Sequence, residues 1–119
     1  QTCALPIYEN GSGCHINFSS IETRSNEGIE VIYHMIKKLE KRHAEHMEVY
    51  GEGNRDRLTG IHETESYDKF TWGIGSRNTS IRIGNKTFKD GKGYFEDRRP
   101  ASNVDPYLAT QTMCETCFE

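Results

Sequence analysis

The chain has 119 residues, of which 34% are hydrophobic and 28% are charged. A chain of this length forms one small domain or part of one, and no apolar run approaches the roughly 20 residues that a membrane span requires. Fifteen Lys and Arg against 18 Asp and Glu leave a formal net charge of −3, which argues against a nucleic-acid binder with a basic face.

The first seven residues back-translate to CAG ACG TGT GCT CTT CCG ATC, a string that resembles a sequencing-library adapter. We therefore interpret residues 1–8 as adapter-derived and exclude them from the fold analysis, the alternative being a genuine N-terminal strand. On the adapter interpretation, residues 9–119 are the native sequence, and the residues that precede Glu9 in the natural protein are missing.

After a turn signal at residues 10–13, the stretch His15–Ser19 alternates polar and apolar side chains and predicts a strand. His15, Asn17 and Ser19 share its polar face. A face with an imidazole, an amide and a hydroxyl either lines a site or is the solvated side of an antiparallel sheet.

Residues 27–50 are predicted to form one helix, with Ser25 or Asn26 as its N-cap and Gly51 as its end. Apolar side chains at three- and four-residue spacing predict one buried stripe. The stripe comprises Ile29, Ile32, Ile36, Leu39 and either His43 or Met47. The charged residues between 37 and 42 are expected to face solvent.

Residues 51–68 and 84–91 are predicted loops, and strands are expected at 69–74, 78–83 and 93–98. In the last strand, alternation places Tyr94, Glu96 and Arg98 on one face and Phe95 and Asp97 on the other. Asp105 as an N-cap and Pro106 in the first turn predict a final helix that ends near residue 117. These elements indicate an α+β domain, or part of one, with no internal repeat.

Two short pairs suggest a metal site but also have simpler explanations. His43 and His46 lie three residues apart on the predicted helix, where a packing or surface role is the favoured interpretation. Cys114 and Cys117 are half of a zinc motif whose second pair is lacking, and thiols at this spacing share a helical face in any case.

Five arginines lie in or beside the predicted loops and strands, namely Arg57, Arg77, Arg82, Arg98 and Arg99. Their guanidinium groups bind carboxylates and phosphates through paired N–H groups. His15 and Glu96, on separate predicted strands, offer nitrogen and oxygen ligands to a divalent metal ion. Together these residues favour phosphoryl chemistry on an anionic substrate, and the alternative is a surface where the arginines pair with Asp and Glu.

Four stretches together resemble the eukaryotic-type, plant-like glutamine synthetases. They are NGSGCHINFS (10–19), RLTGIHET (57–64), SIRI (80–83) and KGYFEDRRPASNVDPY (92–107). The resemblance runs in order from Asn10 to Glu119 and corresponds to the C-terminal part of the family's catalytic domain. It implies an α+β fold with an antiparallel β-sheet and packing helices.

The resemblance implies ATP-dependent ligation of ammonia to L-glutamate, giving L-glutamine. In this reaction the γ-carboxylate of glutamate attacks the γ-phosphate of ATP, and ammonia then displaces phosphate from γ-glutamyl phosphate. Mg²⁺ or Mn²⁺ ions shield the phosphate charge.

Position by position, the resemblance assigns metal ligation to His15 and Glu96, two of three protein ligands of one metal ion. Glutamate binding is assigned to Asn10, Gly11, Arg57 and Arg98. ATP binding is assigned to Asn17, Ser19, Arg77, Arg82 and Tyr94. The catalytic residues are Glu63, Arg77 and Arg57, and Glu63 lies on a flap that attracts ammonium, helps to deprotonate it and excludes water.

The resemblance implies that the full-length protein is a homo-oligomer, a decamer built as a double ring. It also implies that the remaining metal ligands and the N-terminal domain lie upstream of the matched stretch. We therefore expect the 119-residue chain alone to be inactive and poorly folded. The cytoplasm is the expected compartment, with the plastid as the alternative, and neither nucleic acid nor membrane is an expected partner. Three other functions stay open: a non-catalytic structural relative, a ligase that joins glutamate to another amine, and a small metal-binding module that uses the His and Cys pairs.

Overall fold

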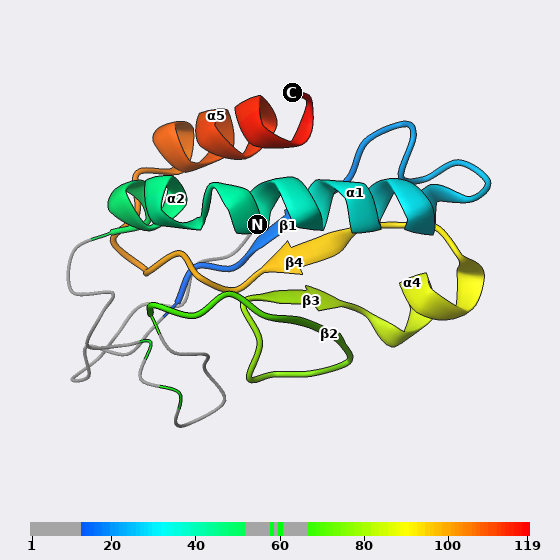
Figure 1. Cartoon of the computed structure of the whole chain (residues 1–119), viewed down its shortest axis with the longest axis horizontal. Coiled ribbons are helices and arrows are strands. Elements are labelled where there is room, and N and C mark those ends of the chain that lie inside the picture. Colours follow the sequence, from blue (N-terminus) through cyan, green and yellow to red (C-terminus); the bar gives the residue numbers. More distant parts are fainter. Residues whose placement is uncertain (1–12, 52–57, 59, 61–66) are drawn as a thin grey trace.

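A computed structural model describes residues 13–51, 58, 60 and 67–119 (Figure 1). In chain order the elements are β1 (Ile16–Phe18), α1 (Gly28–Lys41), α2 (His43–Val49), β2 (Trp72–Ile74), β3 (Ile81–Ile83), α4 (Asn85–Asp90), β4 (Phe95–Asp97) and α5 (Pro106–Cys117). Figure 1 shows α1 and α2 lying along one side of a small sheet, with α5 beyond them. No helix in these ranges is long and apolar enough to cross a membrane.

Within the described ranges, the strands form one sheet in the order β1-β4-β3-β2. β4 is antiparallel to both of its neighbours, but β2 and β3 are parallel. The α+β class is confirmed, whereas the expectation of a wholly antiparallel sheet is wrong. The physical reason is the segment 75–80, which leads the chain back along β2 so that the Ile81 N–H bonds the Thr71 carbonyl at 3.0 Å.

The predicted helix over residues 27–50 is two helices, because the chain breaks at Arg42, whose φ of −108° and ψ of 21° are not helical. Neither predicted N-cap serves as one. Glu27 holds the N-cap position in a left-handed conformation without a capping side-chain bond, and the Ser25 hydroxyl donates to the Ile21 carbonyl at 2.6 Å instead. Gly51, with a φ of 114°, follows the end of α2 as predicted.

The buried stripe of α1 and α2 is largely as predicted. Ile32, Ile36, Leu39 and Met47 are buried, and Ile29 is half-buried. The first three pack with Met35 into a cluster that also contains residues of the sheet and of α5. These other members are Ile81, Ile83, Phe95, Met113 and Cys117. The helices therefore cover one face of the sheet.

The other predicted elements are present with shorter limits. Strands lie within each of the three ranges expected after residue 68, and α5 begins at Pro106 with the Asp105 carboxylate accepting from the Tyr107 and Leu108 N–H groups. The predicted loop at 84–91 is wrong, since Asn85–Asp90 forms the short helix α4. This helix has only 6 residues, which is too short for a helical period of apolar residues to be recognised in the sequence.

Candidate functional site

The register of the sheet brings three predicted site residues into one row. Asn17 on β1 pairs with Glu96 on β4, and Glu96 pairs with Arg82 on β3. Directly paired residues point to the same face of a sheet. In the neighbouring row Asp97 and Ile81 are buried towards the helices, so Asn17, Glu96 and Arg82 occupy the opposite face.

Glu96 lies at the centre of this face, between two basic side chains. Its Oε2 is 3.4 Å from Nδ1 of His15, and its Oε1 accepts a hydrogen bond of 3.2 Å from Nη1 of Arg98. The hydrogen bond with His15, and after it the nearby Arg98, hold the pKa of Glu96 below its ordinary value, although partial burial opposes this shift. Glu96 is therefore an anion at neutral pH, with its side chain 20% exposed.

His15 and Glu96 have the donor atoms of a divalent-metal site, an imidazole nitrogen and a carboxylate oxygen that face each other. Within the described residues, no group of three or more His, Cys, Asp or Glu side chains could hold a metal ion. This pair therefore fits as a partial ligand set, and its metal-binding role stays a prediction.

Arg82 has an unusual local environment. Its Nε is buried and has no hydrogen-bond partner, which holds for no other buried side-chain nitrogen or oxygen in the described part of the chain. An unpaired buried N–H group costs free energy, and a bound anion is one way to satisfy it. Because Arg82 is the neighbour of Glu96 in the row, this free N–H group belongs to the same face of the sheet.

The remaining predicted site residues are less tightly grouped. Ser19 and Tyr94 flank β1 and β4 and are exposed, and Arg77 is exposed in the loop between β2 and β3. Four predicted residues lie outside the described residues, namely Asn10, Gly11, Arg57 and Glu63.

On the helix side of the sheet, a network of buried polar side chains was missed by the sequence reasoning. We call it the buried network, and it comprises His43, His46, Tyr50, Asp97, Arg99 and Thr116. Asp97 and Arg99 pair through Oδ1···Nε at 2.9 Å and Oδ2···Nη2 at 2.8 Å. Arg99 was grouped with the anion-binding arginines, but its position after the alternating residues of β4 places it on the buried side.

Each ionisable member of the buried network is in a defined protonation state at neutral pH. Burial alone would raise the pKa of Asp97, but the Arg99 guanidinium and the hydrogen bonds hold it below its ordinary value. Burial and the Asp97 charge raise the pKa of Tyr50 well above its ordinary value. Burial lowers the pKa of His46 to about 4. The network therefore contains a carboxylate, a phenol and a neutral imidazole.

His46 and Cys117, one member of each short pair that suggested a metal site, are engaged otherwise. The two ring nitrogens of His46 bond Tyr50 and Thr116, so this histidine is a packing residue of the network. Cys117 is buried with its Sγ 3.7 Å from Sδ of Met113, and burial raises the pKa of its thiol to about 12. A thiol in this state is a poor metal ligand, because metals bind the thiolate.

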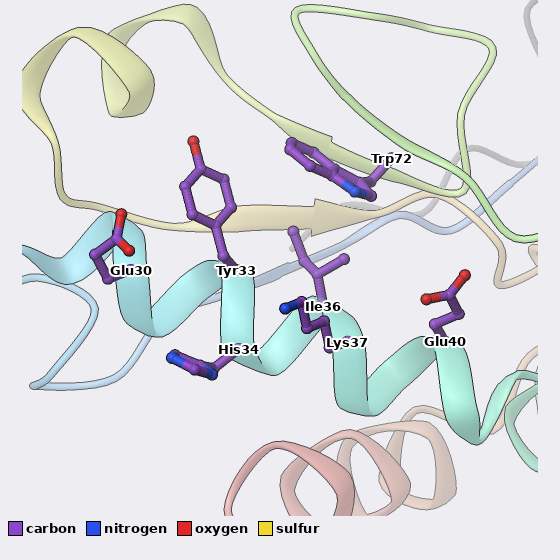
Figure 2. Close-up of a pocket in the computed structure, with 7 residues that line it drawn as sticks. All are labelled: Glu30, Tyr33, His34, Ile36, Lys37, Glu40 and Trp72. Carbon is purple, nitrogen blue, oxygen red and sulfur yellow. The ribbon is translucent and has the colours of Figure 1, made fainter.

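A groove of about 510 Å³ lies between α1 and β2 (Figure 2). It is lined by Glu30, Tyr33, His34, Ile36, Lys37, Glu40 and Trp72. Figure 2 shows Tyr33 and Trp72 leaning towards each other across it, and their ring centroids are 5.4 Å apart. None of the predicted site residues that the structure describes lines this groove, so it is separate from the face that holds Glu96.

No protein-family model matches the chain. It is 58% identical to glutamine synthetase root isozyme A of Pisum sativum over 112 residues, which are 94% of this chain and 31% of that protein. Chloroplastic glutamine synthetase of Brassica napus is 56% identical over 107 residues, which are 90% of this chain and 25% of that protein. Glutamine synthetase of Emericella nidulans is 58% identical over 107 residues, 90% of this chain and 30% of that protein.

The chain thus spans about 30% of the length of the curated relatives that it matches. Their names include cytosolic isozymes as well as a chloroplastic enzyme. The resemblance inferred from the four sequence stretches is therefore confirmed by these relatives.

Proposed function

We propose, on the premise that this chain is a homologue of the eukaryotic glutamine synthetases, that it is the C-terminal part of the catalytic domain of such an enzyme. Its reaction is then the ATP-dependent ligation of ammonia to L-glutamate. The observation that most directly supports this function is the ionised Glu96, which lies between His15 and Arg98 on one face of the sheet with the unpaired Nε of Arg82 in the same row.

In this proposal His15 and Glu96 hold one divalent metal ion, Mg²⁺ or Mn²⁺. The carboxylate is already ionised, and a divalent metal ion binds an ionised carboxylate together with a neutral imidazole. A bound metal ion supplies charge neutralisation for phosphate oxygens. The remaining ligands come from water, substrate or residues outside the described ranges.

The basic side chains bind the anionic substrates. Arg82 donates its unpaired Nε to an oxygen of the ATP phosphates, and the exposed Arg77 binds the transferred phosphoryl group. Arg98 already bonds one carboxylate, Glu96, and we assign it the carboxylate of the substrate glutamate as a second partner. Asn17, Ser19 and Tyr94 contact the nucleotide from the same face of the sheet.

The proposal completes the site with residues outside the described ranges. Asn10, Gly11 and Arg57 bind glutamate, and Glu63 attracts and deprotonates ammonium. The working enzyme is a homo-oligomer of full-length subunits, a double-ring decamer, in the cytoplasm or the plastid.

The test uses the full-length protein of the gene that encodes this chain. We expect it to form glutamine, measured by chromatography, only when ATP, glutamate, ammonia and Mg²⁺ or Mn²⁺ are all present. Glu96→Ala is expected to lower kcat/KM by at least about a hundredfold, because a metal ligand and the partner of Arg98 are both lost.

Glu48→Ala is the matched control, since Glu48 is an exposed carboxylate on α2. It is expected to leave the rate unchanged. Wild-type turnover in Glu96→Ala would contradict the ligand assignment. Product formation with another amine but not with ammonia would favour the related-ligase alternative.

A further inference from the structure

The hydrogen bonds of the buried network run in a fixed direction. The single hydroxyl proton of Tyr50 is donated to Oδ2 of Asp97, at 2.7 Å. The Tyr50 oxygen must then accept from Nδ1–H of His46, 2.7 Å away. Nε2 of that neutral imidazole is consequently the acceptor for the Thr116 hydroxyl, at 2.8 Å. Each hydrogen bond in this chain therefore has one possible donor: Thr116 donates to His46, His46 to Tyr50 and Tyr50 to Asp97.

Tyr50 holds the β4 side of this network at two points. Its hydroxyl bonds Asp97, and its backbone carbonyl accepts from the Ala101 N–H at 2.8 Å. The stretch between these two contacts includes Arg98, whose side chain bonds Glu96. Tyr50 thus fixes both ends of the segment from which Arg98 extends to the opposite face.

The same segment is paired with the chain that leads to His15. Gly13 forms an antiparallel bridge with Ala101, and the Cys14 N–H donates to the Pro100 carbonyl at 3.0 Å. A displacement of residues 97–101 therefore moves His15 as well as Arg98. The two chain segments that present the His15–Glu96 pair are thus both linked to Tyr50, the C-cap residue of α2.

The carboxylate of Asp97 depends on Tyr50 for one of its four donors. Oδ1 accepts from the backbone N–H and from Nε of Arg99, and Oδ2 accepts from Nη2 of Arg99 and from Tyr50. All three Arg99 bonds come from a residue only two positions further along the chain. The bond from Tyr50 is the one among these four that ties the carboxylate to a helix.

We propose that Tyr50 is a positioning residue for the site on the opposite face of the sheet: by holding Asp97 and Ala101 it sets where β4 presents Glu96 and Arg98 and where the paired strand presents His15. This inference deepens the proposed function, since it takes the His15–Glu96 pair to be metal ligands. Tyr50 touches neither metal nor substrate and acts through Asp97.

The test is Tyr50→Phe in the full-length protein, which removes one oxygen and keeps the ring. Mn²⁺ alone is titrated without substrates, and binding is followed by electron paramagnetic resonance at a temperature where circular dichroism shows a wild-type fold. We expect the Kd for Mn²⁺ to rise about 3- to 10-fold. Removing a residue that bonds a metal ligand directly lowers metal affinity by about 10- to 100-fold, and Tyr50 acts less directly. The KM for glutamate is expected to rise in the same range.

Tyr33→Phe is the matched control, because the Tyr33 ring contacts Trp72 in the groove between α1 and β2 and Tyr33 is not a member of the buried network. It is expected to leave the Kd for Mn²⁺ unchanged. Thr116→Val removes the outermost donor of the network and is expected to raise the Kd about twofold, which keeps the proposal testable if Tyr50→Phe does not fold.

A Tyr50→Phe protein that is less stable but binds Mn²⁺ with wild-type affinity would show a purely structural role and overturn the proposal. So would an unchanged Kd in Thr116→Val if that variant alone folds. Failure of the proposed function is seen separately, as a wild-type protein that binds Mn²⁺ but forms no glutamine.

Discussion

Glu27 begins α1 with a φ of 62° and a ψ of 20°, the left-handed region that costs a residue with a Cβ roughly 1–2 kcal/mol. Its side chain makes no capping hydrogen bond that offsets this cost. The strain is imposed by the turn before the helix, where the Gly28 N–H bonds the Ser25 carbonyl at 2.9 Å.

Glu27→Gly is therefore expected to stabilise the first turn of α1 by about 0.5–1 kcal/mol, after the larger entropy of an unfolded glycine is deducted. Native-state hydrogen exchange of the amides at the start of α1 in the full-length protein measures this directly, as slower exchange. Glu30→Gly is the control, since Glu30 is in the helical first turn, and there glycine should speed exchange. Faster exchange in Glu27→Gly would contradict the strain argument.

The sequence shows which way a side chain faces more reliably than what it bonds. Alternation placed Glu96 and Arg98 opposite Phe95 and Asp97 correctly, because a strand has a fixed period of two. The N-cap of α1 was not predictable, because the Ser25 hydroxyl has a competing acceptor one turn earlier, in the Ile21 carbonyl.

At the scale of elements, His46 joins α2 to α5 through Thr116. Burial lowers its pKa to about 4, against 6.5 for an exposed histidine. The unfolded state therefore takes up a proton more readily, so the stabilising effect is complete above pH 6.5 and is lost as the pH falls towards 4. Integrated over this range, the loss is roughly 3 kcal/mol.

We expect hydrogen-exchange protection of the α2 and α5 amides in the full-length protein, corrected for intrinsic exchange rates, to fall as the pH is lowered from 6.5 to 4.5. His46→Gln, which does not titrate, is expected to show a shallower slope, although it starts from lower protection. Equal slopes in the two proteins would mean that His46 is not the titrating group.

The direction of β2 relative to β3 could not be predicted from the sequence. A period-two pattern is the same whether a strand runs parallel or antiparallel, so it carries no information on direction. Here the direction is set by Gly75, whose φ is 67°, and by the hydrogen bonds of the loop that follows. The break between α1 and α2 at Arg42 could not be predicted from the sequence either, because the three- and four-residue spacing of apolar side chains continues across it.

At the scale of the whole molecule, the chain retains large exposed apolar side chains. Tyr107 is 87% exposed and Ile21 is 74% exposed, and Phe88 and Phe118 are each more than half exposed. Apolar side chains that are exposed singly are common on protein surfaces, and the chain spans only about 30% of the length of the curated relatives that it matches.

The 119-residue chain alone is accordingly expected to form no measurable glutamine from ATP, glutamate, ammonia and Mn²⁺, because its described residues include no group of three or more metal-ligating side chains. The full-length protein at equal active-site concentration is the positive control. Glutamine formation by the isolated chain, detected by isotope-labelled ammonia and mass spectrometry, would refute this expectation.

How much of the candidate site could be predicted depends on the range of the contacts. His15 and Glu96 are assigned from motifs, and the structure places Nδ1 of His15 3.4 Å from Oε2 of Glu96. The buried network joins residues up to 70 positions apart, as His46 and Thr116 are. No local pattern encodes such a contact, since each polar residue on its own is equally compatible with a solvated surface.

Trp72 gives the chain an intrinsic optical probe. It is the single tryptophan of the sequence, 45% exposed on β2 and against the Tyr33 ring of α1. Its fluorescence therefore reports whether the first long helix remains seated on the outermost strand, with no label added. Because Trp72 does not lie on the face that holds Glu96, a change in its emission reads the packing of this helix and strand rather than direct contact with a ligand bound beside Glu96.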